Sequence, residues 1–226
     1  MQNSDGKSGT GTPAARPRGR PRAFDRNAAL ERAIRLFWTK GFEATSIADL
    51  TQAMGIGAPS LYAAFGSKEA LYAEALRHYA ETNEGYVWAG FQSAPTARDA
   101  VRSLFMDSAA ALTGCVVDIP RGCMVTLSAV GSEGHEELGE LVRSARAATL
   151  ERLSGRFRRA VEEGEVPAST DLHALARFVQ TLQSGMSILA RDGASRADLE
   201  AVADVAMAGW DARTFRRSDG EDGSRA

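Results

Sequence analysis

The 226-residue sequence predicts an all-α protein in which three short helices near the N-terminus precede a set of longer helices. Apolar residues recur at intervals of three and four along most of the chain, and this spacing places them on one face of a helix. Between residues 25 and 88 there is no alternation of apolar and polar residues of the kind that predicts a strand. Residues that cap or stop helices stand at the ends of the apolar segments, so helix boundaries can be predicted as well.

The first two helices have clear start and stop signals. Asp25 is placed to cap the first helix, and Gly41 is placed to end it. The second helix is predicted to begin after Thr45 or Ser46, because Asp49 completes a Ser-x-x-Asp capping signal. The apolar residues that these two helices turn inward are Leu30, Ala33, Ile34, Phe37, Ile47, Leu50 and Met54.

A third short helix is expected over 58–64, with Pro59 tolerated in its first turn. Ser67 then caps a fourth helix, which continues toward Trp88 and to about residue 90. Later helices are expected at 96–113, 134–163, 171–191 and 196–212, with a loop over 114–121 and a buried apolar segment over 123–130.

The turn between the second and third helices indicates a function. Three short helices with a glycine-broken turn form a helix-turn-helix, in which the third helix presents its N-terminal end to the major groove of DNA. Gly55 supplies a backbone conformation that a side chain would resist. On the third helix, Leu61 and Phe65 are predicted to face inward, and Ser60 and Tyr62 outward.

Residues 28–72 carry a set of short motifs in a fixed order. They are Ala33, Phe37, Gly41-Phe42, Thr45-Ser46-Ile47-Ala48-Asp49-Leu50, Gly55-Ile56, Ser60-Leu61-Tyr62, Phe65 and Lys68-Glu69-Ala70-Leu71. With this set the segment resembles the DNA-binding domain of the TetR/AcrR family of bacterial repressors. The alternative, an all-helical domain that happens to have short helices, does not account for the ordered co-occurrence.

The resemblance implies a role for individual residues. Phosphate contacts position a protein on DNA, and base contacts specify the sequence. Family members often carry bulky residues where this chain has Ala63 and Ala64, so few base contacts are expected. The implied phosphate contacts are Thr45, Tyr62 and Lys68, and the residues implied to face base edges are Gly57, Ala58 and Ser60.

The segment before the first helix is basic. Residues 16–22 read Arg-Pro-Arg-Gly-Arg-Pro-Arg and resemble an AT-hook, whose core is Arg-Gly-Arg-Pro. Arg18 and Arg20 are expected to enter a narrow, negative minor groove beside the site that the third helix reads. The alternative is a solvated basic tail. Residues 1–80 carry a net charge of +4 and residues 81–226 a net charge of −6, which favours a polyanionic partner for the first part.

These observations predict four parts of the chain. Residues 1–22 form a disordered basic arm, because they hold almost nothing to bury, and residues 218–226 form a disordered polar tail. Residues 23–72 form the helix-turn-helix DNA-binding domain. Residues 73–217 form a helical domain for ligand binding and dimerisation.

The last two helices are expected to form the interface of a homodimer. The helix over 171–191 has one seam of apolar residues at alternating intervals of three and four, and a second apolar face of Phe178, Gly185 and Ile188. The alternative is ordinary core within one chain. The residues assigned to the interface are Leu175, Val179, Leu182, Met186, Leu199, Val202 and Ala206.

A ligand cavity between helices is the second expectation for the larger domain, and a simple core is its alternative. Cys123 and Cys115 are more typical of small buried apolar residues than of a redox or electrophile sensor, because their spacing matches no known motif. The residues assigned to the cavity are Trp88, Phe91, Phe105, Met106, Cys123, Met124 and Phe178.

The sequence therefore predicts a ligand-responsive transcriptional regulator, most simply a repressor that a small molecule releases from its DNA operator. An architectural protein that binds DNA without sequence preference is the alternative. An enzyme is not expected, because the chain shows no Ser/His/Asp set, phosphate loop or paired carboxylates, and neither a metal nor a cofactor is expected. The chain has no apolar run long enough for a membrane span and no secretory signal, so a cytoplasmic location is expected.

Overall fold

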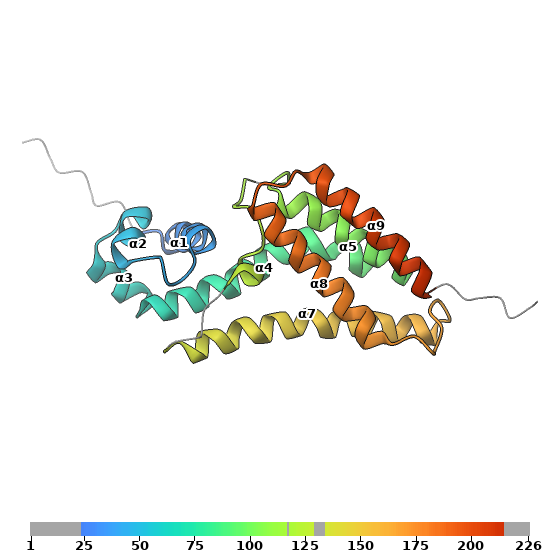
Figure 1. Cartoon of the computed structure of the whole chain (residues 1–226). Coiled ribbons are helices and arrows are strands. Elements are labelled where there is room, and N and C mark those ends of the chain that lie inside the picture. Colours follow the sequence, from blue (N-terminus) through green and yellow to red (C-terminus); the bar gives the residue numbers. More distant parts are fainter. Residues whose placement is uncertain (1–23, 117, 129–133, 215–226) are drawn as a thin grey trace, which may run out of the picture.

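The computed structural model describes residues 24–116, 118–128 and 134–214, and within these ranges every regular element is a helix (Figure 1). The N-terminal unit comprises α1 (Arg26–Lys40), α2 (Ile47–Met54) and α3 (Ala58–Phe65). The long helix α4 (Lys68–Ser93) begins in this unit and connects it to the rest of the chain. The remaining helices are α5 (Ala97–Leu112), α6 (Met124–Leu127), α7 (Glu136–Glu162), α8 (Leu172–Arg191) and α9 (Arg196–Thr214).

The core has two parts, and α4 runs through both of them (Figure 1). The first part holds the apolar faces of α1, α2 and α3 against the beginning of α4, where Leu71 is fully buried. The second part holds α5 against α8 and α9, and the end of α4 contributes Phe91 to it. Cys123 packs against both parts, at the start of α6.

The predicted start and stop signals are confirmed. The Asp25 side chain accepts a hydrogen bond from the amide of Ala28 at 3.0 Å, so it caps α1. Ser46 and Asp49 form a reciprocal capping box at the start of α2. Gly55 ends α2 with a left-handed backbone, φ 71°, which favours glycine because it has no Cβ.

The segment predicted as buried over 123–130 is only partly so. It contains the single turn α6, of which Met124 is buried while Val125 and Thr126 are half-buried. Residues 129–133 lie outside the described residues, as do the predicted arm, 1–22, and the predicted tail, 218–226.

Candidate nucleic-acid interface and ligand cavity

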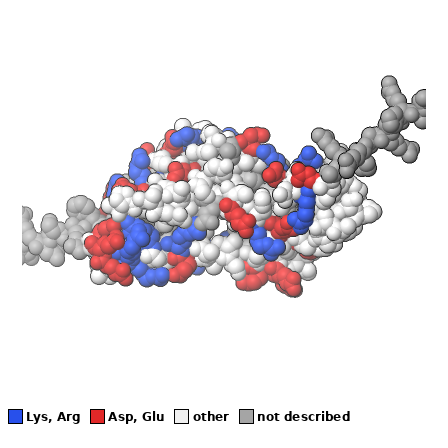
Figure 2. Space-filling view, turned by 180° about the vertical axis from the view of Figure 1, so that it is seen from behind, with Lys and Arg blue, Asp and Glu red and all other residues white. Residues whose placement is uncertain are grey.

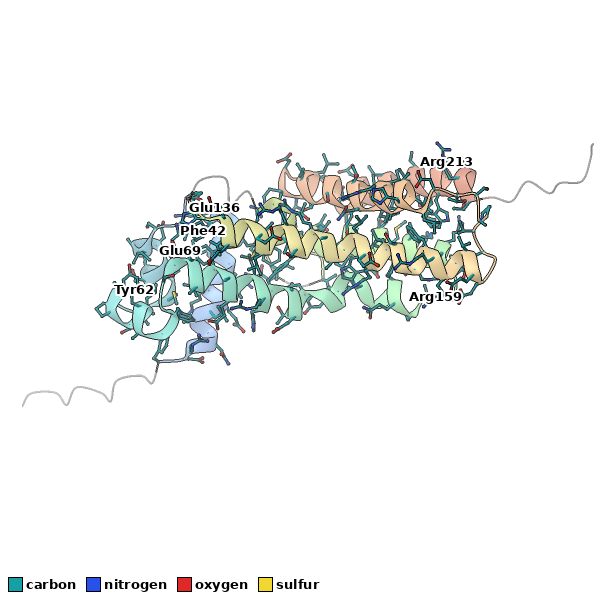
Figure 3. All side chains as sticks on the ribbon, turned by 90° about the horizontal axis from the view of Figure 1, so that it is seen from below. Phe42, Tyr62, Glu69, Glu136, Arg159 and Arg213 are labelled. Carbon is teal, nitrogen blue, oxygen red and sulfur yellow. The ribbon has the colours of Figure 1, made fainter. Side chains whose placement is uncertain are left out.

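The exposed face of α3 is the first candidate site. Leu61, fully buried, and Phe65, 6% exposed, anchor this helix in the N-terminal core. As a result Ser60 and Tyr62 point away from the core, and Tyr62 is 47% exposed. Figure 3 shows Tyr62 at one end of the elongated molecule, with Arg213 and Arg159 at the other.

The start of α3 adds backbone groups to this face. Gly57 caps the helix with an extended backbone and no side-chain hydrogen bond, so it leaves the first turn uncovered. Gly57 is exposed and Ala58 is half-buried. Pro59 has no N–H, and the amides of Ser60 and Leu61 donate to the carbonyl of Gly57 at 3.0 and 3.1 Å, which leaves the amide of Ala58 to face an anion such as a DNA phosphate.

The position of α3 depends on how α2 is held against α1. Lys40, the last residue of α1, forms an ion pair with Asp49 of α2, with 2.9 Å between Nζ and Oδ1. The Ser46 amide donates to the Asp49 carboxylate, and with Lys40 and the Ser46 hydroxyl it lowers the pKa of Asp49 to about 2. Arg32 of α1 donates to the carbonyl of Met54 at 3.1 Å and so binds the other end of α2.

Two of the residues that are implied to contact phosphate, Lys68 and Thr45, are not fully exposed in the structure. Lys68 is half-buried, and its Nζ lies 4.2 Å from the centre of the Phe42 ring, a cation–π contact that orients the side chain. Thr45 is fully buried and its hydroxyl donates to the carbonyl of Gly41 at 2.6 Å. In this structure the Thr45 side chain therefore stabilises the turn before α2, and the expectation that Thr45 contacts phosphate stays a prediction.

Charge is distributed unevenly between the folded unit and the arm. Residues 24–80 hold six Lys or Arg and six Asp or Glu, so the basic excess of the N-terminal third comes from residues 1–23. Figure 2 shows basic and acidic side chains interspersed over one face of the molecule. Arg18 and Arg20, the predicted minor-groove contacts, lie outside the described residues.

A cavity of about 300 Å³ is the second candidate site. It lies between α4, α7 and α8, with α6 at one end. Its apolar lining includes Val87, Trp88 and Leu112. The remaining lining residues are Tyr79, Ala80, Asn83, Cys123, Val125, Thr126, Ala145, Arg146, Ala148, Thr149, Arg152, Gln180, Gln183 and Ser184.

The cavity differs from the predicted one. Of the seven residues assigned to it, Trp88 and Cys123 line it. Phe91, Phe105 and Met124 are at most 3% exposed because they fill the two cores. Met106 is half-buried against the second core, and Phe178 is 41% exposed on the surface.

Most of the cavity-lining residues that were not predicted from the sequence are polar. Gln180, Gln183 and Ser184 lie in the cavity wall on α8, and their spacing of three and four, which places these polar side chains on one side of the helix, was the available signal. Tyr79 of α4 donates a hydrogen bond to the Cys123 sulfur, with 3.3 Å between oxygen and Sγ. Burial, together with the nearby thiol, raises the pKa of Tyr79 well above its usual value, so its hydroxyl stays a donor.

The residues assigned to the dimer interface also need correction. Leu175, Val179 and Met186 on α8, and Leu199 and Ala206 on α9, are at most 6% exposed within one chain. They pack in the core with α5, so a second copy cannot reach them, whereas Leu182 and Val202 are half-buried. The large apolar residues that these helices expose are Phe178, Ile188, Leu189 and Val205.

Two negative observations concern the described residues. In that part of the chain, no three His, Cys, Asp or Glu side chains come together as a group that could hold a metal ion. Nor does it contain a helix that combines the length and apolar character needed to cross a membrane.

Comparison with known proteins identifies the family. The N-terminal model of the bacterial regulatory proteins of the tetR family matches residues 29–75. The transcriptional repressor ComR of Escherichia coli (strain K12) is 36% identical over 200 residues, which cover 85% of this chain and 92% of ComR. The repressor BdcR of the same strain is 32% identical over 200 residues, with 87% and 93% covered.

Solved structures agree. The regulator CifR of the TetR family, in a cysteine variant complexed with 26-base-pair double-strand operator DNA, is 41% identical, with a TM-score of 0.79. That match covers 85% of this chain and 100% of CifR. The predicted fold class and the predicted resemblance are therefore confirmed, and the chain belongs to the tetR family of bacterial regulatory proteins, as a DNA-binding transcriptional regulator and not an enzyme.

Proposed function

We propose that this protein is a repressor that binds an operator as a homodimer and is released from it by a small molecule. The observation that carries the proposal is the exposed face of α3, where Ser60 and Tyr62 project from a helix anchored by Leu61. The names of ComR and BdcR as repressors, and the complex of CifR with operator DNA, support the same function.

On DNA, the N-terminal end of α3 enters the major groove. The Tyr62 hydroxyl and the Lys68 ammonium contact phosphates, while Ser60 and the backbone of Gly57 and Ala58 face base edges. The arm supplies Arg18 and Arg20 to the adjacent minor groove. Residues 23–72 thus bind DNA, and residues 73–217 bind the ligand and the second copy of the chain. Helix α4 links the two domains.

The dimer forms through the outer face of α8 and α9. Phe178, Ile188, Leu189 and Val205 are 41–76% exposed in one chain, so pairing two copies removes their apolar surface from water. Gly209 lies beside Phe178, and a small residue there allows helices to approach closely. A two-fold dimer then places its two α3 helices in successive major grooves, about 34–36 Å apart.

The effector occupies the cavity between α4, α7 and α8. The described lining contains the cations Arg146 and Arg152 and no acidic residue, and much of its wall is apolar. These features favour a small, mostly apolar molecule that is neutral or negatively charged. Binding shifts the dimer toward a geometry that no longer fits the operator, and so relieves repression in the cytoplasm.

Selection of binding sites from a random DNA pool tests the proposal. A repressor is expected to bind the selected site at least about 10³-fold more tightly than random DNA. A screen of small molecules by thermal shift, followed by titration of the operator with each hit, then tests the effector. A ratio near one would instead indicate an architectural DNA-binding protein.

A further inference from the structure

The C-terminal end of α1 is bound by residues of the regulatory half. Arg191, the last residue of α8, donates to the carbonyls of Trp38 and Thr39 at 2.7 and 3.2 Å. Its Nε donates to the carbonyl of Arg121 at 2.9 Å. The last carbonyls of a helix lack partners within the helix and carry partial negative charge, so a guanidinium is well suited to hold them.

Trp38 makes the second connection. Its indole Nε1 donates to the carbonyl of Gly122 at 3.1 Å, across 84 positions of sequence. Its ring meets the ring of Tyr79 edge to face, with 4.7 Å between centroids. Trp38 is 5% exposed, so these contacts are made inside the protein.

The same groups form one end of the cavity. Tyr79 and Cys123 line it and are hydrogen-bonded to each other. The Cys123 amide donates to the hydroxyl of Ser187 on α8 at 2.8 Å. The cavity wall therefore reaches α1 by two routes: Tyr79 contacts Trp38 directly, and Cys123 follows Gly122, whose carbonyl accepts from Trp38.

The loop at Gly122, which joins Trp38 to Cys123, is tightly packed. A Cβ on Gly122 would lie 2.5 Å from the Leu127 side chain and 2.9 Å from the Ser187 carbonyl, so the loop is packed tightly on α6 and α8. Because Gly122 has no room for even a methyl group on this side, a shift of the adjacent Cys123 is expected to move the Gly122 carbonyl to which Trp38 donates.

We infer that a molecule in the cavity acts on DNA binding through Tyr79 and Cys123, which move the end of α1 by way of Trp38 and the Arg191 clamp. The inference rests on the proposed effector cavity. It extends to the DNA-binding face because Lys40, two residues after Trp38, holds α2 through Asp49. Trp38 and Arg191 are thus coupling residues, and neither of them lines the cavity.

The two cysteines of the chain allow a test in which the occupant is known. Benzyl methanethiosulfonate transfers a benzylthio group to a thiolate and releases methanesulfinate. In the Cys115→Ser variant the group is attached to Cys123, at the cavity wall; in the Cys123→Ser variant it is attached to Cys115, which is exposed. The second protein is the matched control.

Labelling Cys123 is expected to weaken binding to the selected operator by about 5–150-fold, the usual range of coupling between two sites, and labelling Cys115 to leave it unchanged. Arg191→Gln and Trp38→Phe, each in the Cys115→Ser background, are expected to bind the operator before labelling and to lose most of the effect of the label. If Trp38→Phe does not fold, Arg191→Gln alone decides.

Three results would overturn the inference: an unchanged operator affinity after Cys123 is labelled, a Cys123 thiol that does not react in the folded protein, or a full effect of the label in Arg191→Gln. Hydrogen exchange of the amides at 37–41 gives a readout without DNA, and faster exchange is expected on labelling Cys123. A protein that shows this change but selects no operator would refute the proposed function and leave the coupling intact.

Discussion

Replacing both Ile188 and Val205 with glutamate is expected to yield a folded monomer. Within one chain these residues are 51% and 76% exposed, so a carboxylate at either position reaches water and leaves the core intact. In the dimer proposed above the same carboxylates would be buried without partners, and such burial is costly. The substitutions therefore separate dimerisation from folding.

The size of the effect follows from the exposed fractions. Full burial of an aliphatic side chain contributes about 1.5–3 kcal/mol, so covering the exposed half to three quarters of each residue contributes about 1–2 kcal/mol. Each substitution occurs twice in a two-fold dimer, so the double variant loses about 4–8 kcal/mol of apolar burial before any cost of the charges. The dissociation constant is then expected to rise at least about 10³-fold.

Sedimentation velocity at micromolar protein measures the outcome, with circular dichroism and thermal melts to verify the fold. Val116→Glu is the matched control, because Val116 is 49% exposed but lies in the loop after α5, and this variant is expected to stay dimeric. Met186→Glu is expected to unfold, since Met186 is 1% exposed in the core. A double variant that still sediments as a dimer would show that this face of α8 and α9 is not the interface.

Three further predictions concern DNA binding and the N-terminal unit. Tyr62→Phe is expected to weaken binding to operator and random DNA equally, and Ser60→Ala to change the ranking of operator variants, as gel-shift titrations would show; a changed ranking for Tyr62→Phe would contradict the assignment. Replacing Arg18 and Arg20 with alanine is expected to abolish a preference for A·T flanks and to reduce the slope of log K against log salt by about 2 per subunit; an unchanged flank preference would leave the arm a solvated tail. Because the pKa of Asp49 falls from 3.8 to about 2 on folding, its contribution to stability is complete above pH 3.8 and is lost as the pH falls through 2; in acid titrations followed by circular dichroism, Asp49→Asn should lack this component, and identical curves would refute it.

The helices could be predicted from the sequence because their signals are local. Asp25, Ser46 and Gly55 act within a few residues of where they stand, so the ends of α1 and α2 follow from the sequence alone. The cavity depends on contacts between distant segments. Phe91 and Phe105 share the apolar character and helical spacing of cavity residues, but the packing of the helices around the second part of the core buries Phe105 fully and leaves Phe91 3% exposed.

The proposed dimer face of α8 also depends on contacts between segments that are distant in sequence. The sequence of α8 predicts two apolar faces, and nothing in the spacing decides which of them turns inward. In the structure Val179 and Met186 face α5, while Phe178 and Ile188 remain exposed. The position of α5, which is far from α8 in sequence, decides which face of α8 turns toward the core.

On the proposed function, the operator is recognised largely through the dimer and the arm. The residues at the start of α3 are small, and Gly57, Ala58 and Ser60 offer few groups that read bases. The folded N-terminal unit is electrically balanced over residues 24–80, so it adds little to the attraction for phosphates. Affinity then depends on arginines of the arm, and selectivity on whether two α3 helices match the spacing of their half-sites. The DNA binding of such a regulator is sensitive to dimer geometry. A small displacement of α1 shifts α3, and so changes the distance between the two α3 helices on which its selectivity depends.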